Sequence, residues 1–164
     1  MDLVVVKVCK RAREVIREGM TDLELVAELE FTARNAGHQG LVRMRGFNNE
    51  LFFGHVFSGT DSAIPTYSDT PLGGVGLNPS FPQGASYKKI RRHEPITVDF
   101  SGIFDGYIVD QTRMFSIGEL PDQLTNAYND MVAIQEHAKQ VAQPGVSWGG
   151  LYEECLQMAC DLGH

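Results

Sequence analysis

Two alternating segments joined by Asp105-Gly106 constrain the fold of this chain more than any other feature. Residues 96–104 and 107–115 both alternate apolar and polar side chains, which is the period of a half-buried strand. An Asp-Gly pair between two such runs is typical of a β-hairpin, because its backbone suits a tight turn. We therefore predict an antiparallel hairpin over residues 96–115.

This hairpin gathers carboxylates and hydroxyls on one face. With Asp105-Gly106 as the whole loop, Asp110 lies opposite Ser101, and Asp99 is diagonal to Asp110. With residues 103–106 as the loop, Asp99 and Asp110 lie directly opposite each other. Both loops have an even number of residues, so both place the two carboxylates on the same face. That face also carries Thr97, Ser101 and Thr112, whereas the other face carries Ile96, Val98, Phe100, Val109 and Phe115.

Two carboxylates placed this close repel each other and need a neutralising partner. A shared proton, a basic side chain or a metal ion would each serve. Two hard oxygen ligands on a rigid hairpin suit Mn²⁺, Co²⁺, Zn²⁺ or Mg²⁺, and Arg113 could orient one of the carboxylates. The alternative interpretation is an exposed polar sheet face without a site.

Helices are expected on either side of the hairpin, which makes the chain α+β. Apolar residues recur at helical steps near the N-terminus, and Thr21 with Glu24 predicts a capping box for a second helix. Residues 41–95 are rich in Gly, Pro, Ser and Asn, which predicts strands joined by long loops. Two further helices are expected over 121–141 and 148–162. Their candidate core residues are Leu124, Tyr128, Met131, Ala138, Val141, Trp148, Leu151, Cys155, Met158 and Leu162.

The composition excludes several classes of partner. The chain has 164 residues, about one domain, and 14 Lys and Arg against 21 Asp and Glu leave a net charge of −7. This acidity argues against a nucleic-acid partner. No apolar run approaches the ~20 residues that span a bilayer, so no membrane partner is expected. The three cysteines cannot all pair within the chain, and reduced thiols in a cytoplasmic protein are the simplest interpretation.

The hairpin also resembles a known motif. Val-Asp-Phe-Ser-Gly at 98–102 and Gly-Tyr-Ile-Val-Asp-Gln-Thr-Arg at 106–113 are similar to the first metal-ligand motif of the pita-bread metallopeptidases. This family includes methionine aminopeptidase, Xaa-Pro aminopeptidase, prolidase and the non-metal relative creatinase. The segment 19–24, Pro144-Gly145 and Leu151-Tyr152 resemble its flanking segments. The resemblance implies a partial pita-bread fold, an antiparallel sheet with helices packed on one face.

The resemblance also implies a site and a function. Residues 1–164 would be the first half of a catalytic domain, without the second half and without a preceding N-terminal domain. Asp99 and Asp110 would bind two divalent ions (Mn, Co or Zn) that a His and two Glu of the second half complete, with Thr112 and Arg113 supporting them. The parent would be an Xaa-Pro aminopeptidase or dipeptidase-like hydrolase of short peptides. The isolated fragment would be inactive, bind metal weakly and form a homo-oligomer.

Thr66 departs from the family pattern. The family places a substrate-contacting His in this loop, whereas Thr66 can form hydrogen bonds but cannot carry a positive charge. This departure favours an alternative, a non-catalytic pita-bread module that binds peptides or protein partners. His55 and Thr66 are the candidate substrate-pocket residues, and His38 and His93 are expected to be in solvent.

Overall fold

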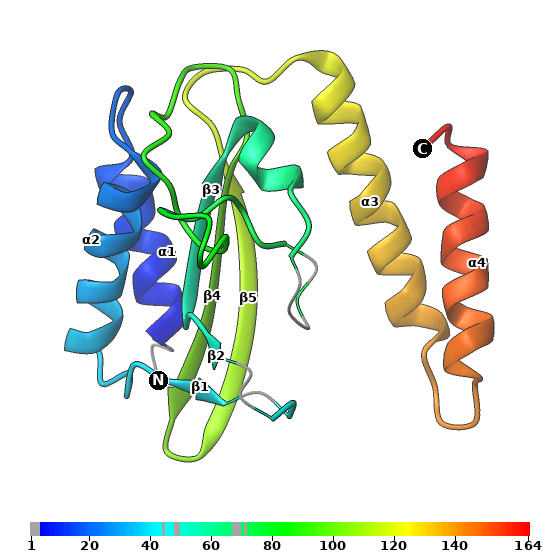
Figure 1. The fold of residues 1–164 in the computed structure, drawn as a ribbon. Coiled ribbons are helices and arrows are strands. Elements are labelled where there is room, and N and C mark those ends of the chain that lie inside the picture. The colour runs from blue at the N-terminus through cyan, green and yellow to red at the C-terminus, as the bar shows by residue number, and fades with distance from the viewer. Residues whose placement is uncertain (1–3, 44, 48–49, 67–69, 71) are drawn as a thin grey trace. The chain divides into compact units, whose positions relative to one another are not determined.

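The computed structural model describes residues 4–43, 45–47, 50–66, 70 and 72–164. The chain forms two compact units, Met1–Glu119 and Leu120–His164. The second unit consists of α3 (Asp122–Val141) and α4 (Trp148–Asp161). The first unit holds α1 (Val4–Val15), α2 (Asp22–Asn35), β1 (Val42–Arg43), β2 (Glu50–Leu51), β3 (Gly54–Ser58), the short 3₁₀ helix η1 (Gly59–Ala63), β4 (Ile96–Phe104) and β5 (Tyr107–Phe115), as Figure 1 shows.

The start of α2 is fixed by the predicted capping box. Thr21 Oγ1 accepts a hydrogen bond from the Glu24 N–H at 3.1 Å, and Glu24 Oε2 accepts one from the Thr21 N–H at 2.8 Å. Together these bonds satisfy two of the donors that a helix N-terminus leaves open. The prediction of a helix beginning here is confirmed.

The main sheet has three antiparallel strands in the order β3-β4-β5. Asp105 and Gly106 form the turn between β4 and β5, with φ angles of 50° and 81°. Ser101 is therefore the partner of Asp110, and Asp99 is the partner of Thr112. This is the register that the two-residue loop predicts, whereas the four-residue alternative is wrong.

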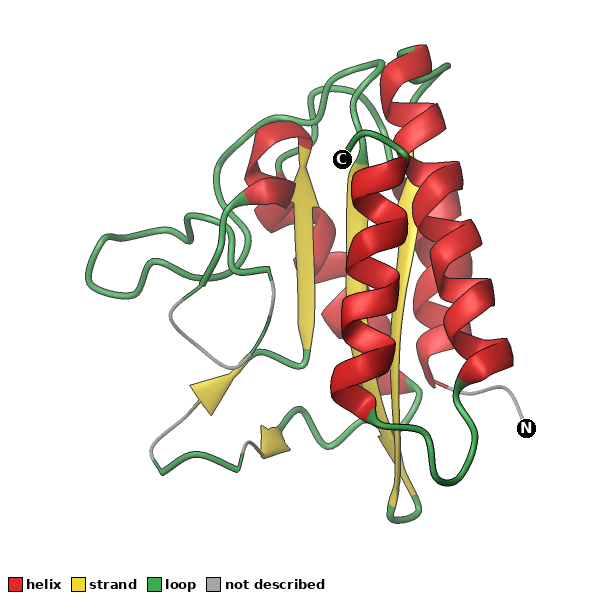
Figure 2. Cartoon of the chain, turned by 90° about the vertical axis from the view of Figure 1, so that its right-hand side faces the viewer, coloured by secondary structure: helices red, strands yellow, loops and turns green. Residues whose placement is uncertain are grey.

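One face of this sheet carries the core. Helices α1 and α2 pack against each other and against the sheet (Figure 1), whose strands Figure 2 shows in yellow. The predicted apolar face lies under these helices, and Ile96, Val98 and Phe100 are all buried. Gly102 continues this face, because a Cβ there would lie 2.7 Å from Val5 Cγ2. The other buried members of the core are Val4, Val5, Val8, Ala12, Met20, Leu25, Val26, Leu29, Ala33, Phe53, Val56 and Ile90.

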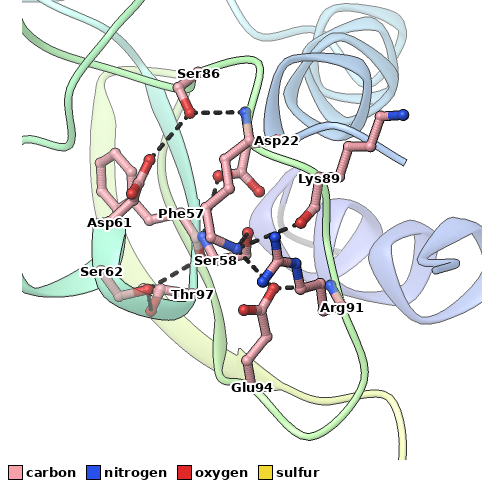
Figure 3. A network of polar contacts seen from close by, with 11 residues as sticks. Asp22, Phe57, Ser58, Asp61, Ser62, Ser86, Lys89, Arg91, Glu94 and Thr97 are labelled. Atoms are coloured by element: carbon pink, nitrogen blue, oxygen red, sulfur yellow. Dashed lines mark hydrogen bonds and ion pairs between the residues drawn. The ribbon is translucent and has the colours of Figure 1, made fainter. Parts of the chain in front are cut away.

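The long loop between η1 and β4 is closed at its base by polar contacts (Figure 3). The Gly59 N–H donates to the Pro95 carbonyl at 2.8 Å, and Ser86 Oγ donates to Asp61 Oδ2 at 3.0 Å. Lys88 Nζ bonds both Ser58 Oγ at 2.8 Å and Glu94 Oε1 at 2.7 Å. The two ends of the loop are therefore held together beside the end of β3.

Asp22 links this network to α2. Its side chain is fully buried, and its Oδ2 accepts a hydrogen bond from the Ser58 N–H at 3.2 Å. The Asp22 N–H donates in turn to the Lys88 carbonyl at 3.0 Å. The first turn of α2, the end of β3 and the returning loop are thus connected through one residue, by its carboxylate and its backbone N–H.

The second unit corrects part of the sequence interpretation. Its two helices form close to the predicted bounds, but none of the residues of α3 and α4, all of which the structure describes, is buried. Trp148, assigned above to the core, is 87% exposed. Apolar periodicity shows which face of a helix can pack against a partner. Two helices alone have too little surface to bury their apolar faces completely.

His38 is a second correction. It was expected in solvent but is 3% exposed, with its ring stacked on Phe53 at 4.5 Å between ring centres. Its Nδ1 accepts a hydrogen bond from the Gly40 N–H at 2.7 Å, so the loop after α2 folds around the imidazole. No helix in the described part of the chain combines the length and apolar character needed to cross a bilayer.

Candidate metal centre

The two aspartates of the hairpin lie on the sheet face opposite α1 and α2. Asp99 is on the central strand β4 and Asp110 is on the outer strand β5, one diagonal step apart. Diagonal neighbours on an antiparallel pair lie about 7–8 Å apart. Two carboxylates at this separation can contact the same bound ion or small ligand from two strands.

Thr112 fixes the orientation of one of these carboxylates. It is the cross-strand partner of Asp99, and its Oγ1 donates a hydrogen bond to Asp99 Oδ1 at 2.6 Å. Hydroxyl-to-carboxylate bonds of this length are among the strong hydrogen bonds of proteins. This bond uses Oδ1 of Asp99 and not its second carboxylate oxygen.

The electrostatics of the pair favour a cation. Desolvation of the Asp110 carboxyl, and next the negative charge of Asp99, raise the pKa of Asp110 above its ordinary value. A bound divalent ion would reverse this effect, because an opposite charge stabilises both ionised carboxylates. The donor set, two hard carboxylate oxygens, therefore fits a hard or borderline divalent cation.

The pair is a partial site. Among the described residues, no group of three or more His, Cys, Asp or Glu is arranged to hold a metal ion. Stable sites for such ions use four or more ligands. Asp99 and Asp110 can thus supply only some of the ligands that a resident ion needs.

Arg113 lies on the other side of the sheet from the two aspartates. Its strand partner is Val98, a buried residue of the face covered by helices. Its Nη1 donates to the Thr112 carbonyl at 2.7 Å, and its side chain lines a cavity of about 410 Å³ with Cys9 and Gln111. The expectation that Arg113 orients a carboxylate of the pair finds no support in this geometry.

His55, a candidate substrate-pocket residue from the sequence, lies beside the pair. It is the β3 partner of Asp99, so the two side chains share a sheet face. It is 3% exposed, and its ring contacts Phe57 at 5.3 Å and Phe52 at 5.9 Å between ring centres. Burial lowers the pKa of His55, and the nearby Asp99 charge opposes this shift. No local pattern in the sequence reveals how β3 pairs with β4.

Thr66 stands in the long loop after η1. A Cβ on Gly73 would lie 2.5 Å from the Thr66 Cβ, so these two segments of the loop lie against each other. The Gly73 N–H also donates to the Ile64 carbonyl at 3.0 Å. Thr66, where the family resemblance implies a His, is therefore part of a folded loop.

Comparison with known proteins identifies the family. The model of metallopeptidase family M24 matches residues 3–164, which is nearly the whole chain. This chain belongs to metallopeptidase family M24. The M24 chain is 26% identical over 141 residues to an Xaa-Pro dipeptidase of Pyrococcus furiosus, which covers 86% of the chain and 33% of that relative. It is 33% identical over 100 residues to the uncharacterized peptidase YqhT of Bacillus subtilis, covering 60% of the chain and 27% of that relative.

Solved structures agree with this family. The X-Pro aminopeptidase from Thermotoga maritima superposes with a TM-score of 0.77 at 28% identity, covering 98% of the M24 chain and 38% of that structure. The prolidase from Pyrococcus horikoshii superposes with a TM-score of 0.74 at 22% identity, covering 98% and 39%. The expected α+β, partial pita-bread fold is confirmed. The M24 chain spans about a third of the curated relatives that it matches.

Proposed function

We propose that the protein to which this chain belongs is a metal-dependent peptidase that hydrolyses short peptides of the Xaa-Pro type. The observation that carries the proposal is the placement of Asp99 and Asp110 on one sheet face, with Thr112 holding Asp99. Membership of family M24 supports the metal dependence. The names of the matched relatives, Xaa-Pro dipeptidase and X-Pro aminopeptidase, support the substrate class.

Asp99 and Asp110 would provide part of the ligands for two divalent ions, Mn, Co or Zn. Such ions supply charge stabilisation for a polarised peptide carbonyl and a reactive nucleophile from water at neutral pH. The chain's own contribution is orientation, because β4 and β5 fix both carboxylates and Thr112 fixes one oxygen of Asp99. The remaining ligands are to be sought in the two thirds of the relatives that the chain does not span.

The substrate pocket is proposed to include Thr66 in the long loop. A threonine there supplies a neutral hydrogen-bonding group where the family carries an imidazole. Substrates that need a positively charged or proton-transferring partner at this point are disfavoured. Recognition of the peptide would then depend more on shape and on neutral hydrogen bonds.

The second candidate function is a non-catalytic module that binds peptides or protein partners. One observation favours it: Thr66 stands where the resemblance to the pita-bread family implies a histidine. Both functions share the peptide as ligand. They differ in whether the two aspartates bind a metal ion.

We also propose a cytoplasmic location, with peptides rather than nucleic acid or membrane as partners. The cysteines of the described residues, Cys9, Cys155 and Cys160, are all free thiols. The net charge of −7 disfavours a phosphate backbone as ligand. Fractionation of cells with an antibody to this chain tests the location.

A pair of charge-removing variants tests the metal proposal. Asp110→Asn keeps the shape of the side chain but removes a ligand charge, so binding of Mn²⁺ or Zn²⁺ should weaken at least tenfold. Asp105→Asn is the matched control, because it makes the same change at the exposed tip of the same hairpin and asparagine tolerates its φ of 50°. Isothermal titration of each variant measures the affinity.

The same variants then separate enzyme from binding module. In the protein that spans the length of its relatives, Asp110→Asn should abolish hydrolysis of an Xaa-Pro dipeptide while Asp105→Asn retains it. Equal metal affinity in all three proteins would refute the metal centre. Metal binding without hydrolysis of any dipeptide would favour the non-catalytic module.

A further inference from the structure

Asp99 has a strand neighbour on each side, and of these two described residues only Thr112 forms a hydrogen bond with it. On β5, Thr112 donates to Asp99 Oδ1 at 2.6 Å. On β3, His55 is its direct strand partner and lies on the same face. The central carboxylate of the sheet thus stands between a hydroxyl and an imidazole.

The imidazole of His55 carries an unsatisfied atom. Its Nε2 is buried and has no hydrogen-bond partner within the described structure. Leaving such a group unpaired costs about 1–3 kcal/mol, and buried polar atoms in folded proteins are nearly always paired. A phenylalanine would fill the space between Phe52 and Phe57 without this cost. We therefore expect Nε2 to form a hydrogen bond with a group of the protein or of its ligand in the functional state.

The burial of Nε2 limits its hydrogen-bond partner to a group inside the protein. An atom without solvent access cannot meet a substrate in an open pocket, so the substrate-contact role expected for His55 fits poorly. The ionisable group directly opposite it is the carboxylate of Asp99, whose second oxygen is not held by Thr112. A small rotation of either side chain within its own rotamer well would change the contact between them.

We propose that His55 is a positioning residue whose Nε2–H donates to the Asp99 carboxylate when that carboxylate binds a divalent cation. The proposal rests on the metal centre of the proposed function. Asp99 would then be held from β3 by His55 and from β5 by Thr112, as carboxylates that bind metal ions are held by outer hydrogen bonds. His55 would donate as a neutral imidazole, which adds no positive charge next to the cation.

The variants for the test follow from the burial pattern. His55→Phe keeps an aromatic ring among Phe52 and Phe57 but removes the donor. His55→Gln restores a donor N–H at the reach of Nε2. His38→Phe is the matched control, because His38 is equally buried, also has an unpartnered Nε2 and stacks on Phe53, but lies in the loop after α2.

The experiment uses the protein that spans the length of its relatives, with Zn²⁺ as the probe, because this chain supplies only some of the metal ligands. The dissociation constant for Zn²⁺ should rise about tenfold in His55→Phe, return to within about threefold of wild type in His55→Gln, and stay unchanged in His38→Phe. Proton–nitrogen correlation spectra of the wild-type imidazoles should show the His55 Nε2–H tautomer, with a Zn²⁺-dependent shift that is absent from His38. The spectra keep the proposal testable even if His55→Phe does not fold.

The outcomes separate the two proposals. If the wild type binds Zn²⁺ through Asp99 and Asp110 but His55→Phe binds equally well, the positioning role is overturned and the metal centre stands. If His55→Gln binds Zn²⁺ as weakly as His55→Phe, the ring rather than its N–H donor matters, and the positioning role is again overturned. A nitrogen shift typical of direct coordination would make His55 a ligand and overturn it as well. Absence of binding that depends on the two aspartates overturns both proposals.

Discussion

Asp22 shows how much a single buried carboxylate can control. It is fully buried in the first turn of α2, and its Oδ2 accepts a hydrogen bond from the Ser58 N–H. Burial, the largest influence, raises the pKa of Asp22 from 3.8 to about 6, although bonds from Ser58 and the charge of Lys88 oppose it. Near neutral pH the group is ionised in a place that disfavours its charge.

The pH dependence of stability should reveal this residue. Between about pH 4 and pH 6 the unfolded chain has lost the Asp22 proton while the folded chain keeps it, so the free energy of unfolding falls as pH rises. Relative to Asp22→Asn, the wild type should lose about 1–3 kcal/mol across this window, from about 1.4 kcal/mol per pKa unit. Urea denaturation at a series of pH values measures the difference.

Asp61→Asn is the control for this prediction. Asp61 belongs to the same network through Ser86, but its side chain is only partly buried. The unfolding free energy of Asp61→Asn should still fall across the same window, only slightly less than that of the wild type, because the Asp61 charge is the smallest influence on the pKa of Asp22. A wild type and an Asp22→Asn variant with parallel pH profiles would show that the carboxyl titrates normally.

At the residue scale, sequence reasoning located side chains only where they share a regular element. Asp99, Asp110 and Thr112 were placed on one face because a hairpin has a period of two. The burial of Asp22 was missed and His38 was misplaced, because their surroundings come from segments distant in sequence. No local pattern encodes that β3 pairs with β4 or that Lys88 returns to Ser58.

The hairpin is the element whose geometry depends most on its turn. Gly106 has a φ of 81° with no atom near a hypothetical Cβ, so Gly106→Ala tests backbone strain alone. We expect a loss of about 1 kcal/mol in unfolding free energy, because L-residues are disfavoured at positive φ. Gly149→Ala in α4 is the control, since its φ is not positive and its Cβ would meet only Ser147 Oγ at 3.8 Å.

Urea midpoints of the two variants provide the measurement. A destabilised Gly106→Ala beside an unchanged or more stable Gly149→Ala is the expected pattern. Equal effects in both variants would mean that the turn carries no strain and that the strand pairs, rather than the loop, set the register.

The elements themselves were predicted better than their packing. Helices over 121–141 and 148–162 were expected, and α3 and α4 end within a residue or two of these bounds. Capping residues and helix-ending glycines act locally, which explains this success. Burial of Trp148 and of the apolar stripe depends on a partner surface, and periodicity cannot supply one.

At the scale of the whole molecule, exposed apolar strand surface points to self-association. β5 is the outer strand of its sheet among the described residues, and Ile108 on it is 67% exposed. Unpaired edges of this kind recruit further strands unless a charge blocks them. We expect the chain to run larger than an 18.2 kDa monomer on a sizing column with light scattering.

One substitution on β5 should reverse this behaviour. Ile108→Lys places a charge on the strand edge and should shift the chain toward the monomer. Phe31→Lys is the control, since Phe31 on α2 is about as exposed but lies on a helix. A wild type that is monomeric at every concentration, or two variants with the same effect, would exclude the β5 edge as the contact.

The closed base of the long loop affects which insertions and deletions the sequence can tolerate during evolution. Because the Gly59–Pro95 and Asp61–Ser86 bonds join the two ends, insertions and deletions between them leave the sheet in place. Doubling the length of a flexible loop costs only about 0.6 kcal/mol of closure entropy. The hairpin has no such freedom, since one inserted residue would turn a carboxylate toward the core. Natural variation can therefore change the length and sequence of the loop around Thr66, whereas the number of residues between Asp99 and Asp110 stays fixed.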